Sequence, residues 1–73
     1  MIDKHLYELI RPIVSKYIDF ENDIIEITKY LVKEKRDNDI WNRNKIQVKL
    51  LGLSPNSSYF DIDRIITETE NVE

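Results

Sequence analysis

The chain has 73 residues, enough for one domain but not for two. It contains no cysteine, which excludes disulfide bonds and thiolate metal sites, while its 41% hydrophobic and 34% charged residues favour a folded core over global disorder. No apolar run approaches the roughly 18 residues that span a bilayer, and the N-terminal residues lack the layout of a signal peptide. We therefore expect one cytoplasmic domain over residues 1–73.

The formal net charge of −3 hides an asymmetry along the chain. Residues 29–49 hold seven of the eleven basic residues but only three of the fourteen acidic ones. The middle of the chain could therefore bind a polyanion and its ends a basic partner, whereas the alternative is a solvated helix surface of mixed charge. Because a domain of this size has a small core, we also expect a homo-oligomer, in the simplest case a homodimer.

One glycine and two prolines leave few sites for tight turns, so the sequence predicts an all-α domain of three or four helices. Apolar residues recur every three or four positions over residues 4–18, which predicts a first helix with Asp3 as its N-cap. Pro12 lies inside this segment and should kink the helix without ending it. A second helix is predicted over residues 20–36, with Asp19 as its N-cap and an apolar stripe of Phe20, Ile24, Ile27 and Leu31.

The residues that follow predict a turn at Asp37, Asn38 and Asp39. Residues 40–53 are ambiguous, because residues 46–50 alternate as a half-buried strand would, while Gly52 is well placed to cap the C-terminus of a helix. We favour the helix, since no partner strand is evident and a lone strand cannot satisfy its backbone.

A last helix is predicted from Ser54 and Pro55, because serine caps helices and proline suits the first helical position. Tyr59, Ile62 and Ile66 would share its apolar face. Residues 69–73 are polar, and we expect them to be frayed.

Catalysis is not expected from these residues. His5 is the only histidine, so no aspartate–histidine or cysteine–histidine pair can form. Residues 37–39 lack the glycine and the distal glutamate of a calcium-binding loop, and a single glycine excludes a phosphate-cradling loop. We therefore expect neither an enzyme nor a bound metal or cofactor.

The segment around Gly52 resembles the helix-turn-helix of bacterial and phage DNA-binding proteins. Val48 lies four residues before the glycine, Leu53 follows it, and Ser54 opens the polar turn. The resemblance implies that Gly52 bends the chain in a left-handed conformation, that Val48 and Leu53 pack the two helices together, and that the helix beginning near Pro55 enters the major groove.

The same resemblance implies which side chains would contact DNA. Those facing the bases would be Asn56, Ser57 and Ser58, and those contacting phosphate would be Arg43, Lys45 and Lys49. Asp61 and Asp63 depart from the pattern, because carboxylates facing DNA would repel phosphate. The alternative is a structural corner between two helices with no role in DNA binding.

Three aromatic residues are candidates for an interface, because such residues dominate binding patches: Trp41, Tyr7 and Tyr30. Their alternative position is the edge of the core. The expected function is a small regulatory DNA-binding protein of phage, plasmid or bacterial type. The alternative is a small adaptor or inhibitor that binds another protein through the acidic faces around residues 19–26 and 61–70, or a homo-oligomerisation module.

Overall fold

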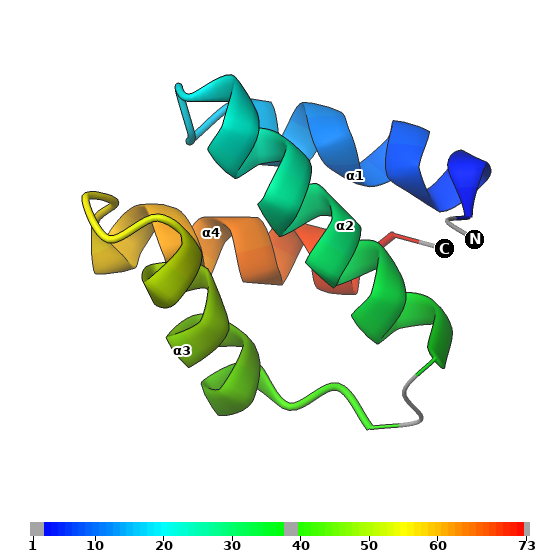
Figure 1. Ribbon diagram of the computed structural model, residues 1–73. Helices are drawn as coiled ribbons and strands as arrows, with labels where there is room; N and C mark the ends of the chain where they lie inside the picture. Colours follow the sequence, from blue (N-terminus) through cyan, green and yellow to red (C-terminus); the bar gives the residue numbers. More distant parts are fainter. Residues whose placement is uncertain (1–2, 38–39, 73) are drawn as a thin grey trace.

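The computed structural model describes residues 3–37 and 40–72, which form four α-helices (Figure 1). The helices are α1 (Lys4–Ser15), α2 (Glu21–Asp37), α3 (Arg43–Leu53) and α4 (Tyr59–Glu70). Each helix packs on the next one in the chain, and α4 closes the bundle against α1. The predicted all-α fold is confirmed, and none of the helices in these two ranges is both long and apolar enough to cross a bilayer.

The core is built from aliphatic side chains of all four helices. Its buried members are Ile10, Val14, Ile18, Ile24, Ile27, Leu31, Val32, Ile46, Leu50, Ile62, Ile65 and Ile66. Full burial of one such side chain is worth about 1.5–3 kcal/mol, so the packing of these apolar faces, more than helix propensity, stabilises the short helices. Figure 1 shows α2 passing in front of α4, with the α1–α2 connection and the α3–α4 turn on the same side of the molecule.

The first helix begins as predicted and ends early. Asp3 is its N-cap and accepts a hydrogen bond from the Leu6 amide at 3.1 Å, and Pro12 lies within a continuous helix. The helix ends at Ser15, three residues before the predicted end. The chain then turns tightly, so that Ile18 reaches the core from outside the helix.

The second helix begins one residue later than predicted. The amide of Ile24 donates to the carbonyl of Phe20 at 2.9 Å, so Phe20 and not Asp19 holds the cap position. Asp37, predicted to lie in a turn, is the last residue of the helix, while Asn38 and Asp39 lie outside the described residues. The shift arises because the chain first anchors Ile18 in the core and only then enters α2.

Residues 46–50 are helical, so the strand alternative is wrong. The alternating pattern arises because the apolar residues of α3 spread around the helix: Ile46 and Leu50 are buried one turn apart, whereas Val48 is 71% exposed. Gly52 is not a C-cap either, since it lies inside α3 and has no positive φ. Asn42 caps the start of this helix by accepting a hydrogen bond from the Lys45 amide at 3.0 Å.

The last helix begins at Tyr59, four residues later than the predicted first helical position at Pro55. Ser54 is buried and caps the end of α3, and its carbonyl accepts a hydrogen bond from the Ser57 amide at 3.1 Å, which closes a turn. Ser58 is the N-cap of α4. The helix extends to Glu70 and buries Thr69, so two of the residues expected to fray are helical.

Candidate functional site

Arg43, expected to contact phosphate, is instead bonded within the domain. It is the first residue of α3, and its guanidinium donates to Asp63 at 2.7 Å, to Thr67 at 3.2 Å and to the carboxylate of Glu70. Two acids of α4 therefore neutralise this arginine, which ties the start of α3 to α4.

Lys45 and Lys49, the other two residues assigned to phosphate, are exposed on α3. The ammonium of Lys49 lies 5.8 Å from the centre of the Tyr30 ring, on the neighbouring helix α2. Within the described part of the chain, neither lysine forms an ion pair. These two cations remain available to an anion.

The three residues assigned to base contacts lie in the α3–α4 turn, residues 54–58, and not on a helix. Asn56 is exposed. The hydroxyl of Ser57 is bonded to that of Ser54 at 2.7 Å, and the hydroxyl of Ser58 accepts the amide of Asp61 at 3.1 Å. The turn is therefore held by two of the three side chains that the resemblance assigned to DNA.

The three aromatic interface candidates are half-buried and pack against the core: Tyr7, Tyr30 and Trp41. The ammonium of Lys35 lies 5.4 Å from the centre of the Trp41 ring. Burial raises the pKa of the Tyr30 hydroxyl, and the nearby Glu34 carboxylate adds to this rise. These rings sit at the edge of the core, which is the position that the sequence left open beside a role in an interface.

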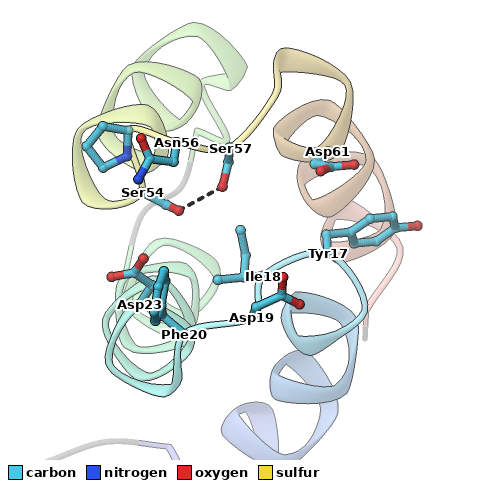
Figure 2. A pocket seen from close by; sticks show the side chains of 10 residues that line it. Tyr17, Ile18, Asp19, Phe20, Asp23, Ser54, Asn56, Ser57 and Asp61 are labelled. Atoms are coloured by element: carbon cyan, nitrogen blue, oxygen red, sulfur yellow. Dashed lines mark hydrogen bonds between the residues drawn. The ribbon is translucent and has the colours of Figure 1, made fainter.

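A hollow of about 190 Å³ opens where the α1–α2 connection (residues 16–20) meets the α3–α4 turn (Figure 2). Its lining comes from these two segments and from the first turns of α2 and α4: Tyr17, Ile18, Asp19, Phe20, Asp23, Ser54, Pro55, Asn56, Ser57 and Asp61. Figure 2 shows Ile18 pointing toward the hydroxyls of Ser54 and Ser57.

The charges of this lining are all negative. Asp19 and Asp23 lie on one side of the hollow and Asp61 on α4 across from them, and no lysine or arginine lines it. None of these three carboxylates forms a hydrogen bond or ion pair with any described residue, whereas the neighbouring Glu21 is paired with Arg11. The fold therefore leaves three uncompensated carboxylates around one small cavity.

Exposed aromatic rings accompany these acids. Phe20, Tyr59 and Phe60 are each 70% exposed; Phe20 lines the hollow, and the other two begin α4 just before Asp61. The exposure of Phe20 and Tyr59 contradicts the prediction from the sequence that both residues lie on apolar helix faces. Phe20 is exposed because it precedes α2 and does not share the buried stripe of that helix.

One side of the hollow is tied to the bundle through Glu68. Its carboxylate accepts hydrogen bonds from the ammonium of Lys16 and the hydroxyl of Tyr17, which joins the end of α1 to α4. These bonds hold the pKa of Glu68 below its ordinary value and raise the pKa of Lys16. Tyr17 also lines the hollow, so this wall is fixed in place.

Sequence reasoning found the acidic faces around residues 19–26 and 61–70 but not their meeting point. The signal was present, since aspartates in the first turns of α2 and α4 suit the positive ends of the helix dipoles. What was missing was the pairing of the two connections in space.

No protein-family model, curated protein or solved structure matches the chain.

Proposed function

We propose that the chain is a non-enzymatic binding domain that docks another protein on the acidic-aromatic end of the bundle. This end consists of the three exposed rings and the three unpaired carboxylates: Phe20, Tyr59, Phe60, Asp19, Asp23 and Asp61. The observation that carries the proposal is the exposure of three large rings at this end: Phe20 lines the hollow, and Tyr59 and Phe60 lie in the first turn of α4, which also carries Asp61. Exposed aromatic groups rimmed by polar residues mark protein-binding surfaces, because rings supply large contact areas at a low entropic cost.

The charge of this end favours a protein partner over DNA. The helix assigned to the major groove begins beside three unpaired carboxylates, and these would repel the phosphates of a duplex. Several features implied by the helix-turn-helix resemblance are also different here. Gly52 has no left-handed conformation, and Val48 is exposed. The helix after the turn begins at Tyr59 and not near Pro55.

Affinity capture tests the proposal by comparing matched variants. The tagged chain, its Phe20→Ser/Phe60→Ser double variant and a Val48→Ser control are each incubated with a lysate of the organism that encodes the chain. We expect a protein that the first and third retain and that the double variant retains roughly tenfold less, as for hot-spot residues. Val48 is equally exposed but lies in the middle of α3, so it reports general stickiness. Equal retention by all three chains would contradict the proposal.

A second candidate function, DNA binding, is favoured by the exposed Lys45 and Lys49 on α3. In this form the outer face of α3, and not the helix after the turn, would contact phosphate as part of a regulatory protein. A gel shift with random duplex at low and high salt tests it. A salt-sensitive shift that disappears for Lys45→Glu supports DNA binding, and no shift at micromolar protein counts against it.

We also propose that the chain is cytoplasmic and forms a homodimer. The cysteine-free composition suits a reducing compartment, and the small core would gain stability from a second copy. Imaging of a fluorescent fusion tests the first, and size-exclusion chromatography with light scattering tests the second. A monomer at all concentrations would remove the homodimer.

A further inference from the structure

We infer that the hollow binds a single arginine side chain presented by the partner. This inference rests on the proposed function and adds the chemistry by which the partner is recognised. The acidic-aromatic end would be the docking surface, and the hollow its specific pocket. Its occupant is an arginine-bearing segment of a protein. Charge, size and the number of acceptors favour this occupant.

Charge complementarity selects a cation. Five acids and one base occur in residues 16–23 and 54–63, the two segments that meet at this end, and the base, Lys16, is paired with Glu68. Two of the five are compensated within the domain, Glu21 by Arg11 and Asp63 by Arg43. The three that remain are the three that line the hollow, so the unpaired charge is concentrated where a ligand can enter. A cation from outside would supply the missing partner.

Size and spacing argue against a metal ion and against an enclosed small molecule. Within the described ranges, no three acidic, histidine or cysteine side chains converge as metal ligands, so the three carboxylates are too widely spaced to share a metal ion. The cavity of about 190 Å³ is smaller than the roughly 300–1,000 Å³ of pockets that enclose small-molecule ligands. One side chain carried on a longer chain suits both limits.

The acceptors favour arginine over lysine. Carboxylates stand on two sides of the hollow, and the paired hydroxyls of Ser54 and Ser57 keep free lone pairs after their mutual bond. A guanidinium has five donors in one plane, so it can reach several separated acceptors at once, whereas an ammonium is a compact point charge. Phe20, at the edge of the hollow, offers a ring face on which a guanidinium stacks well.

A nuclear magnetic resonance titration tests the inference with defined probes. The uniformly labelled chain is titrated with acetyl-Gly-Arg-Gly-amide, with the lysine analogue and with the citrulline analogue, which has the shape of arginine without its charge. Sodium chloride equalises the ionic strength. We expect the arginine peptide to shift amides of residues 17–23 and 54–61 with a Kd on the order of 1–10 mM. The lysine peptide should bind roughly threefold more weakly or worse, and citrulline should cause no saturable shift.

Substitutions locate the site. Asp23→Asn and Asp61→Asn should each weaken arginine binding about threefold and together about tenfold, since each removes one charge-assisted partner. Glu26→Gln is the matched control, because it removes the same charge from an exposed position of α2 that does not line the hollow. The dispersion of the amide spectrum confirms that every variant is folded. No saturable shift at tens of millimolar arginine peptide, equal binding of citrulline, or equal binding by the double variant would overturn the inference.

Its failure is distinguishable from that of the proposed function. If the captured protein depends on Phe20 and Phe60 but not on Asp23 and Asp61, the arginine pocket is wrong and the docking surface stands. If the peptide binds in the hollow while protein capture ignores the rings, the pocket stands and the proposed docking surface is wrong.

Discussion

The carboxylates of α4 behave differently in its first turn and in the rest of the helix. After the first turn, Asp63 and Glu70 bind Arg43 of α3, and Glu68 binds Lys16 and Tyr17 at the end of α1. In the first turn of the same helix, Asp61 lines the hollow and forms no ion pair with any described residue, and the same holds for Asp19 and Asp23. Carboxylates therefore join helices in the paired region, whereas those at the hollow have no partner among the described residues.

The difference shows what net charge alone conceals. The acids of the paired region contribute to the packing of α4 on α1 and α3, because each has an opposite charge that the fold brings to it. The acids of the hollow have no such partner among the described residues, so nothing there compensates their like charges. Five measurements test this contrast between the paired acids and the acids of the hollow.

The largest effect is expected from the core that supports both regions. Ile65→Ala removes a fully buried side chain of α4 and should cost about 2–5 kcal/mol, the typical price of such a truncation. A small core supplies roughly 3–5 kcal/mol in total, so the variant should be largely unfolded by circular dichroism. Ile65→Val, expected to cost about 0.5–1.5 kcal/mol in urea denaturation, keeps the comparison measurable. An unchanged free energy of unfolding for both variants would contradict the observed packing.

The next effect tests the paired region. Arg43→Ala leaves Asp63 and Glu70 without their shared cation and should lower the free energy of unfolding by about 0.5–1 kcal/mol, the upper range for partly exposed ion pairs. Lys45→Ala is the matched control, because it removes a positive charge from the same helix without breaking an ion pair. Urea denaturation of both variants gives the difference, and equal losses would show that the pairing contributes nothing.

Gly52→Ala should raise the free energy of unfolding by a similar amount. The glycine lies in α3 without a positive φ, and an added Cβ would meet no atom within 4 Å. Alanine should therefore stabilise the chain by about 0.4–1 kcal/mol, because it loses less backbone entropy on folding. A left-handed turn at Gly52 would instead make the same substitution destabilising, so the sign of the change in thermal midpoint separates the two geometries.

The pH dependence of the paired region should come from Glu68. Its pKa is lowered in the folded chain by hydrogen bonds from Lys16 and Tyr17, so its contribution to stability is present above its ordinary value of 4.5 and is lost as the pH falls through the lowered value. Glu68→Gln should therefore lower the thermal midpoint at neutral pH, and the gap from the parent chain should close in acid. A gap that persists unchanged in strong acid would contradict this account, and Glu26→Gln serves as the control.

The smallest effect is expected at the hollow. Asp19→Asn removes an exposed carboxylate that has no ion pair, so the free energy of unfolding should change by less than about 0.5 kcal/mol. Any change should be a gain, because the substitution relieves repulsion from the other acids of the hollow. A loss of the size expected for Arg43→Ala would show that the hollow's acids are structural as well, and the contrast between the two regions would disappear.

Local chemistry read from the sequence predicted the parts of the fold that depend on neighbouring residues. Asp3 caps α1, Pro12 is accommodated inside it, and the stripe of Ile24, Ile27 and Leu31 marks the buried face of α2. These features follow from short-range rules, namely the orphan amides at a helix start and a period of 3.6 residues. The sequence also placed an excess of acids around the first turns of α2 and α4.

The turn after α3 depended on longer-range packing. The cap of the last helix was predicted at Ser54, although Ser58 is as good a cap by local rules. In the structure, Ser54 is buried at the end of α3, which leaves Ser58 to begin α4. Gly52 was misassigned for a related reason, since the helix continues past it as far as Leu53.

The sequence by itself determined four helix-forming segments, the residues able to fill their core, and a separation of basic and acidic charge along the chain. Only the tertiary structure decided which acids acquire a partner, because Arg43 lies 20 and 27 residues before Asp63 and Glu70, and Lys16 lies 52 residues before Glu68. The same packing brings the α1–α2 connection against the α3–α4 turn and so encloses the hollow. Compensation of charge depends on distances in space, and the order of residues in a chain does not fix those distances.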